Sequence, residues 1–134
     1  GEFAVTALEA QHASPEEDAL NYVLEKDGRG LLIGHDTGWW PDRTWEQVEG
    51  LTIHLAILEC TYGLLDPDAV AHHLGVAATV RFRDELRRRG ALAESATVVA
   101  NHFSHNGRGN YDRLREWFAP HGISVGYDGM VLEV

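Results

Sequence analysis

Three residues of types that bind metal ions each follow a short apolar stretch of the sequence. They are His12, Asp36 and His102, and the preceding stretches are residues 3–8, 31–33 and 98–100. Ligand-binding groups collect beyond the carboxyl ends of strands in α/β sheets, so we expect these side chains to converge. Two imidazoles and a carboxylate suit zinc or manganese. The sequence therefore predicts a divalent metal bound by these three residues.

Each of these residues taken alone also has a simpler interpretation. Asp36 begins an Asp-Thr-Gly sequence, which is often only a turn in which the aspartate accepts backbone hydrogen bonds. A single histidine at a strand end is more often a hydrogen-bonded surface residue than a ligand. His102 and His105 are three residues apart and would share one face of a helix, which is a weak indication of a site.

The elements that must position these residues alternate between strands and helices, which is typical of an α/β layer. We expect strands at 3–8, 20–25, 31–33, 54–60 and 97–100, with a turn at Asp27-Gly28. We expect helices at 41–48, 73–89 and 111–118, the first with a capping box of Thr44 and Gln47. A hairpin of residues 123–127 and 130–134 is expected to close a single domain that covers residues 1–134.

Composition excludes some functions. The net charge of −10 argues against a nucleic-acid surface, and the arginines between 81 and 89 alternate with acidic residues, as on a solvated helix face. The sequence contains no apolar run of the ~20 residues that span a bilayer, so no membrane partner is expected. The single cysteine, Cys60, lies in an apolar run and is expected to be a buried, inert thiol. A cytoplasmic location is expected, because nothing indicates a disulfide.

Five motifs occur in an order that resembles one family, the phosphodiesterase branch of the metallo-β-lactamase superfamily. They are Gly34-His35-Asp36-Thr37-Gly38, Leu58-Glu59-Cys60-Thr61-Tyr62, His72-His73-Leu74-Gly75, Asn101-His102-Phe103-Ser104-His105-Asn106 and Gly126-Tyr127-Asp128-Gly129-Met130. This branch includes the enzyme of phosphonate breakdown that opens a phosphoribosyl cyclic phosphate. The resemblance runs from about residue 3 to residue 134.

The resemblance implies a fold, a metal site and a reaction. The fold would be the C-terminal half of an αββα sandwich, with one mixed sheet and helices on its outer face. His12 would bind the first metal, His102 the second, and Asp36 would bridge both. His73 and His105 would be catalytic, His73 as a general acid or a phosphate contact. The intact protein would use two divalent ions, zinc or manganese, to hydrolyse a small phosphorylated substrate. No function is assigned to His35, His54, His72 and His121.

The sequence lacks the defining signature of this family, His-x-His-x-Asp-His, which supplies four ligands from the N-terminal half. We therefore expect the chain to be a fragment, or half of a split protein, with negligible activity alone. Its sheet would expose an apolar face that a second copy or the missing N-terminal half covers. One alternative is a non-catalytic interaction domain that pairs with a partner chain. Another is an RNA nuclease of the same superfamily, which the acidic charge disfavours.

Overall fold

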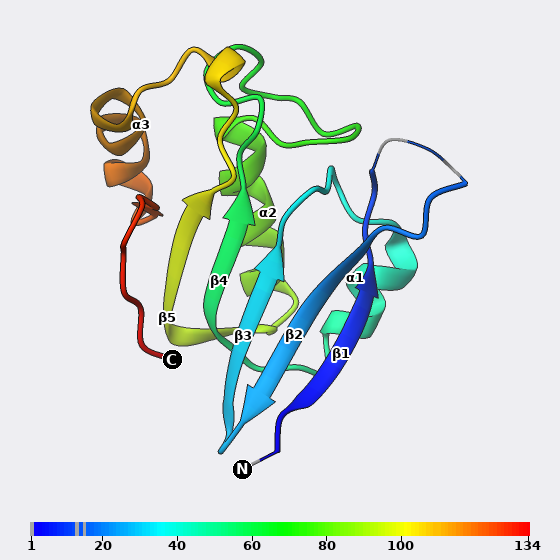
Figure 1. Ribbon diagram of the computed structural model, residues 1–134. Coiled ribbons are helices and arrows are strands. Elements are labelled where there is room, and N and C mark those ends of the chain that lie inside the picture. Colours follow the sequence, from blue (N-terminus) through cyan, green and yellow to red (C-terminus); the bar gives the residue numbers. More distant parts are fainter. Residues whose placement is uncertain (1, 13, 15) are drawn as a thin grey trace.

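A single mixed sheet of six strands forms the centre of the computed structural model, which describes residues 2–12, 14 and 16–134 (Figure 1). The strands lie side by side in sequence order. They are β1 (Ala4–Glu9), β2 (Leu20–Lys26), β3 (Arg29–Gly34), β4 (Ile53–Glu59), β5 (Leu92–Asn101) and β6 (Ser124–Val125). The first three strands pair antiparallel, and β3 to β6 pair parallel.

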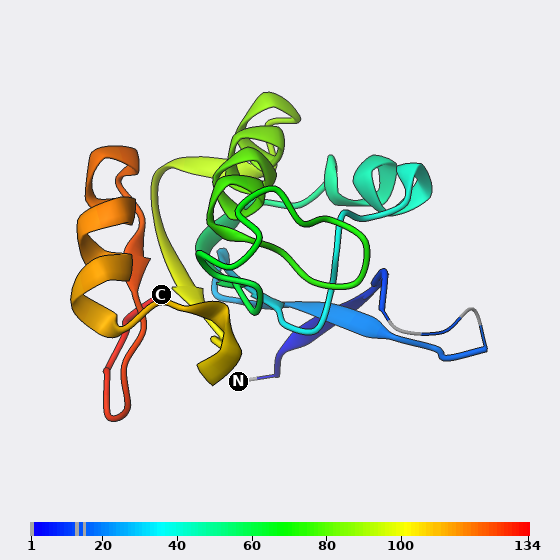
Figure 2. The same cartoon turned by 90° about the horizontal axis from the view of Figure 1, so that it is seen from above.

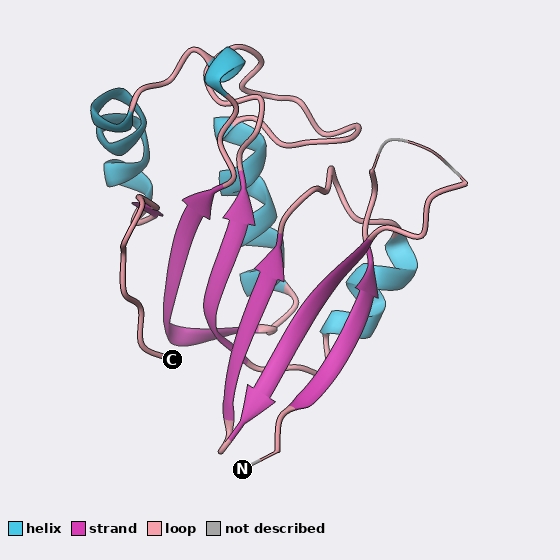
Figure 3. Ribbon diagram, viewed as in Figure 1, coloured by secondary structure: helices cyan, strands magenta, loops and turns pink. Residues whose placement is uncertain are grey.

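The connections explain this change of direction. β2 and β3 are joined by the two-residue turn Asp27-Gly28, and both residues have positive φ, as tight hairpins with a matching twist require. The parallel pairs are joined by crossovers that contain helices, as Figure 3 shows. These helices are α1 (Asp42–Val48), α2 (Val76–Arg88) and α3 (Tyr111–Phe118). The carboxyl ends of β3, β4 and β5 therefore meet at one edge of the sheet.

The core lies between the sheet and the helices α1 and α2, which cover the same face of the sheet (Figure 2). Trp40, Trp45 and Phe82 are buried, and their ring centroids lie 4.6–4.9 Å apart. They pack over strand residues that point to this face, including Val23 and Leu32. α3 lies beside the other end of the sheet, next to β5 and β6 (Figure 1).

The opposite face of the sheet is also apolar, but it is much less covered. Val5 pairs with Leu24 and Tyr22 pairs with Ile33, so all four side chains share this face. Val5 is 58% exposed and Tyr22 is 40% exposed. The C-terminal segment lies against this face, with Met130 and Leu132 near β4 and β5 and Val134 near β2 and β3. The predicted α/β sheet with helices on one face is confirmed, and its second face is largely open to solvent.

Two predictions about helix starts are wrong. The first helix starts after Pro41 without a side-chain cap, because Thr44 and Gln47 donate instead to the carbonyls of Glu9 and Ala7 and fix α1 against β1. The helix expected from residue 73 begins at Val76, so the preceding residues stay in a loop at the sheet edge.

The prediction of a closing hairpin of residues 123–127 and 130–134 is also wrong. β6 pairs with β5 in parallel, and residues 130–134 belong to no strand. β5 is longer than expected, and two short 3-10 helices, η1 (His105–Gly107) and η2 (Ala119–His121), flank α3. No helix within the described part of the chain is long and apolar enough to cross a membrane.

Candidate metal centre

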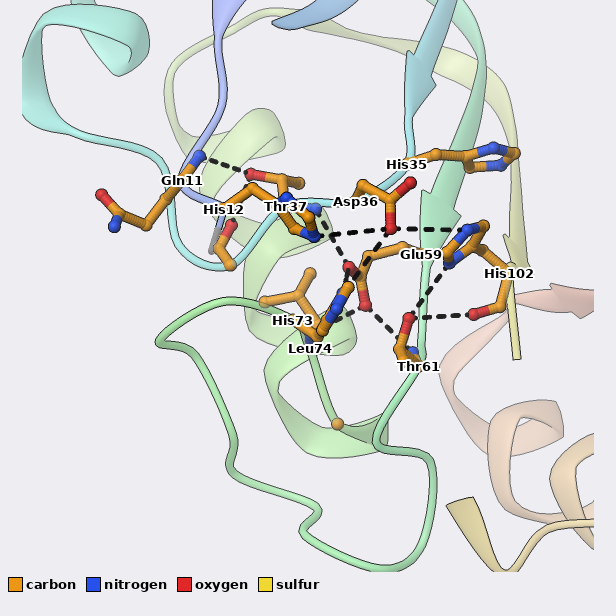
Figure 4. A network of polar contacts seen from close by, with 12 residues as sticks. Gln11, His12, His35, Asp36, Thr37, Glu59, Thr61, His73, Leu74 and His102 are labelled. Atoms are coloured by element: carbon orange, nitrogen blue, oxygen red, sulfur yellow. Dashed lines mark hydrogen bonds and ion pairs between the residues drawn. The ribbon is translucent and has the colours of Figure 1, made fainter. Parts of the chain in front are cut away.

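The three predicted metal ligands lie together at the carboxyl edge of the sheet (Figure 4). His12 follows β1, Asp36 follows β3 and His102 follows β5. The Oδ1 atom of Asp36 lies 3.8 Å from Nε2 of His12 and 3.5 Å from Nε2 of His102. Nδ1 of His73, from the loop before α2, lies 4.0 Å from the same oxygen. The structure therefore places one carboxylate between three imidazoles.

Hydrogen bonds between loops set the spacing of the first two ligands. The Gly38 amide donates to the carbonyl of Gln11 at 2.6 Å, and the Gln11 amide donates to the Thr37 hydroxyl at 3.0 Å. These residues adjoin His12 and Asp36 in the sequence. The distance between the two ligands is therefore determined by backbone groups, and does not depend on contact between their side chains.

Asp36 and His102 both adopt a backbone conformation that residues other than glycine rarely adopt. Their φ angles are +48° and +55°, which cost about 1–3 kcal/mol each. The peptide bond before Asp36 is held by the buried Asn21, whose side-chain amide donates to the His35 carbonyl at 2.7 Å. The Thr61 hydroxyl donates to the carbonyl of His102 at 3.1 Å. These bonds stabilise the turns that direct both side chains toward one point.

Polar groups contact the second ring nitrogen of both histidines. Nδ1 of His12 lies 3.0 Å from a carboxylate oxygen of Glu17, which only accepts hydrogen bonds. Nδ1 of His102 lies 3.1 Å from the Thr61 hydroxyl, which is also 3.1 Å from the His102 carbonyl. In both rings Nδ1 contacts a polar partner and Nε2 is directed toward Asp36. Metal-bound histidines are held in the same way by a partner on the other ring nitrogen.

The distances fit a cation between each histidine and the carboxylate. Among the described residues, the Asp36 carboxylate accepts no hydrogen bond, and the Nε2 atoms of His12 and His102 lie on either side of it. Zinc lies about 2.0–2.2 Å from nitrogen and oxygen ligands, which sets two such atoms about 3.4 Å apart in tetrahedral geometry. Asp36 therefore forms one pair with His12 and one with His102, each with a spacing close to that of two ligands of one cation.

Glu59 is a site residue to which the sequence analysis gave no role. Its side chain is completely buried at the end of β4, and each carboxylate oxygen accepts two hydrogen bonds. Oε1 accepts from Nδ1 of His73 at 2.6 Å and from the Thr37 amide at 3.0 Å. Oε2 accepts from the amides of Thr61 and Leu74, both at 2.9 Å. Glu59 thus joins the loop that carries Asp36 to the loop of residues 60–75 that carries His73, and Thr61 of that second loop contacts His102.

His73 differs from the other two histidines, because its Nδ1 is already bonded to Glu59. Its ring lies 5.1 Å from that of His12, in an edge-on arrangement. A carboxylate fixes the proton on Nδ1, so Nε2 is the atom that remains to contact a substrate. His105, the second predicted catalytic residue, is exposed in η1, and no described contact joins it to the cluster.

A cavity of about 320 Å³ adjoins the cluster on the open face of the sheet. Its walls combine His12, His35 and Asp36 with the apolar side chains of Leu20, Tyr22 and Ile33, among others. Burial and the nearby His102 lower the pKa of His35, whose ring lies 5.2 Å from that of His102. The cavity therefore has one wall with metal-binding groups and one apolar wall that continues onto the open face.

Other polar residues lie outside the cluster. His54 accepts a hydrogen bond from the Gly30 amide in the sheet, His121 packs on Trp117, and His72 is exposed. Burial raises the pKa of the Cys60 thiol to about 12, which confirms the prediction of a buried, inert cysteine.

Comparison with known proteins identifies the fold. No family model and no curated protein matches the sequence. The metallo-beta-lactamase fold protein YhfI from Bacillus subtilis matches with a TM-score of 0.71 and 18% identity over 99% of this chain. The "Putative metal-dependent hydrolase" from Parabacteroides distasonis ATCC 8503 matches with a TM-score of 0.52 and 18% identity over 92%. This chain covers 50% of each of those chains. The fold is therefore that of one half of a metallo-β-lactamase fold.

Proposed function

We propose that this chain carries part of the active site of a metal-dependent hydrolase, with His12, Asp36 and His102 as ligands of two divalent ions. The observation that supports this most strongly is the position of Asp36 between two Nε2 atoms, 3.8 and 3.5 Å away. The carboxylate accepts no hydrogen bond from the described residues, so a bond within the fold does not explain why these groups converge. Nitrogen and carboxylate ligands suit zinc or manganese.

The chain's own residues have distinct tasks in this proposal. A bound divalent ion would lower the pKa of a coordinated water, which makes hydroxide available at neutral pH, and would neutralise charge on a phosphoryl group. Asp36 holds the two ligand pairs at a fixed separation. Glu59 accepts a hydrogen bond from Nδ1 of His73 at 2.6 Å, which leaves Nε2 directed away from Glu59; once Nε2 is also protonated, it can donate to a phosphate oxygen or pass that proton to the leaving group.

We propose a small phosphodiester as the substrate. The cavity of about 320 Å³ beside Asp36 lies within the range of small-molecule sites, about 300–1,000 Å³. A chain with a net charge of −10 needs cations at the site to attract a phosphate group. The order of the five motifs supports the phosphodiesterase branch over others.

We also propose that this chain alone has negligible hydrolase activity. His12 and His102 supply one nitrogen each to the two proposed ions, whereas catalytic metals usually have three protein ligands. The chain spans about half the length of the structures it matches, so further ligands are proposed to come from the other half. A chromogenic phosphodiester assay with added manganese or zinc tests this. Turnover equal to that of a full-length hydrolase of this fold would contradict it.

Metal binding tests the site directly, independently of turnover. Asparagine tolerates positive φ, so Asp36→Asn removes the charge and leaves the turn in place. Calorimetric titration with zinc or manganese should show an affinity at least about tenfold weaker, since even the loss of a supporting partner costs that much.

Asp27→Asn is the matched control, because Asp27 is an exposed aspartate with a φ of +50°. It should bind metal as the unchanged chain does. Equal affinities for Asp36→Asn and the unchanged chain would instead favour a non-catalytic interaction domain.

A further inference from the structure

Two exposed tyrosine rings form a perpendicular pair beside the parallel half of the sheet. Tyr111 is the first residue of α3, and Tyr127 lies two residues after β6. Their ring centroids are 6.0 Å apart and their planes meet at 87°. Tyr111 is 43% exposed and Tyr127 is 58% exposed, so about half of each side chain remains open to solvent.

This arrangement fits a flat ligand. Two perpendicular rings form an inner corner, in which a third ring can stack on one of them and make an edge-to-face contact with the other. Aromatic rings prefer these two geometries. The Arg115 guanidinium lies over the Tyr111 ring, 5.9 Å from its centroid, and this cation–π contact holds that ring in position.

The end of β5 brings the tyrosine pair close to a proposed metal ligand. The Gly126 amide donates to the Ala100 carbonyl at 2.8 Å, so the chain after β6 stays paired with β5 up to its carboxyl end. Tyr127 follows Gly126 and His102 follows β5, so both residues leave the sheet at the same edge. At that edge their backbones are separated by one strand spacing, about 4.8 Å. Figure 1 shows α3, which carries Tyr111, beside the same end of the sheet.

The segment between the metal ligand and the tyrosine pair is basic, although the chain as a whole has a net charge of −10. Residues 102–115 contain three arginines, at 108, 113 and 115, and one acidic residue, Asp112. The Arg113 side chain donates to the Arg108 carbonyl at 3.1 Å, which holds this segment against the start of α3. The exposed Arg108 guanidinium forms no hydrogen bond or ion pair with the described residues. Local positive charge attracts a small anion, whereas a nucleic acid requires many more cations.

We propose that Tyr111 and Tyr127 form a stacking site for a planar aromatic group that is joined to the phosphate of the substrate. This site rests on the proposed function, because the metal centre at His102 would hold the phosphate while the two rings hold the attached group. Stacking accepts any flat ring, since every base or aryl group has a π-face. The substrate class is therefore a small phosphate ester with an aromatic substituent.

Two probes that differ only in the aromatic group test the site, adenosine 5′-monophosphate and ribose 5-phosphate. Each is titrated into the zinc-loaded chain, and NMR follows the ring protons of Tyr111 and Tyr127. The nucleotide should shift these signals through the ring current of its base, and ribose 5-phosphate should not. The nucleotide should also bind at least about fivefold more tightly, as expected for one stacked base.

Tyr127→Leu removes the ring, keeps an apolar side chain at an exposed position, and should abolish most of this preference. Tyr111→Leu should do the same. Phe3→Leu is the matched control, because Phe3 is 59% exposed, has Lys26 over its ring at 5.1 Å, and lies before β1 at the opposite edge of the sheet. It should leave the preference unchanged.

Equal affinities for the two probes, or an unchanged preference in both tyrosine variants, would overturn the stacking site. The zinc titration of Asp36→Asn decides the proposed function separately. If that variant loses zinc affinity while the two probes bind equally, the metal centre stands and the stacking site alone is wrong.

Discussion

Glu59→Gln tests whether the buried carboxylate holds the loops of Asp36 and His73 together. Glutamine has the same shape but only one acceptor oxygen, so its NH2 group must take the place of either Oε1 or Oε2. If the NH2 group takes the position of Oε1, His73 can change tautomer and accept a hydrogen bond from it, but the Thr37 amide loses its acceptor. At Oε2, the amides of Thr61 and Leu74 both lose their acceptor. The arrangement with the smaller loss leaves one buried donor unpaired.

An unsatisfied buried donor costs about 1–3 kcal/mol, and the two hydrogen bonds that remain lose their charge assistance. We therefore expect a loss of about 2–4 kcal/mol in the free energy of unfolding. For a domain of this size, about 4 °C is lost per kcal/mol, so Tm should fall by about 8–16 °C. Calorimetry on metal-free protein measures this shift. Nitrogen NMR should also show the His73 proton move from Nδ1 to Nε2.

Glu46→Gln is the control for this experiment, because Glu46 is exposed on α1. Its Tm should stay within about 2 °C of the unchanged protein, as expected for surface substitutions. The reasoning is refuted if Glu59→Gln behaves like the control and the tautomer of His73 does not change.

Three further predictions concern the fold around the site. Gly38→Ala should unfold at a lower urea concentration and bind metal more weakly, since its Cβ would lie 2.1 Å from the Val70 carbonyl oxygen; Gly50→Ala, with no neighbour within 4 Å, should change neither. Phe82→Ala should lose about 3–5 kcal/mol in urea titrations, because the ring is fully buried among tryptophans, and a loss below about 1 kcal/mol would contradict the core assignment. Hydrogen bonds from Arg88, and then from Arg89, lower the pKa of Glu85 from 4.5 to about 2, so its ion pairs stabilise the fold above about pH 4.5 and are lost as the pH falls toward about 2. The stability difference between the unchanged protein and Glu85→Gln should therefore shrink as the pH is lowered, and a constant difference would contradict this.

The ends of the apolar strands were sufficient to predict that His12, Asp36 and His102 lie together. Each of these residues follows a strand that contains apolar residues, and strand ends in a parallel sheet meet at one edge. The turn at Asp27-Gly28 and the helix 111–118 were predicted correctly for the same local reasons, because turn and helix-end signals act within a few residues.

Contacts between residues far apart in the sequence explain why the capping box and the closing hairpin were predicted wrongly. Thr44 and Gln47 have the spacing of a capping box, but acceptors on β1, 35 and 40 residues away in sequence, bind their side chains instead. Residues 123–134 have the pattern of a hairpin, but parallel pairing with β5 takes Ser124 and Val125. Glu59 carried a signal that was available, since a carboxylate at the end of a buried apolar strand must find several donors.

The left-handed backbone at two of the three proposed metal ligands has a consequence for how the sequence can change. Glycine at either position would relieve the φ angle of +48° at Asp36 or +55° at His102, and would delete a ligand at the same time. A lineage selected only for thermostability would therefore gain by discarding these residues. The same conformation occurs at Asp27 and Arg108 in surface turns, so what distinguishes Asp36 and His102 is that their strained turns bring two ionisable side chains to within 3.5 Å of each other.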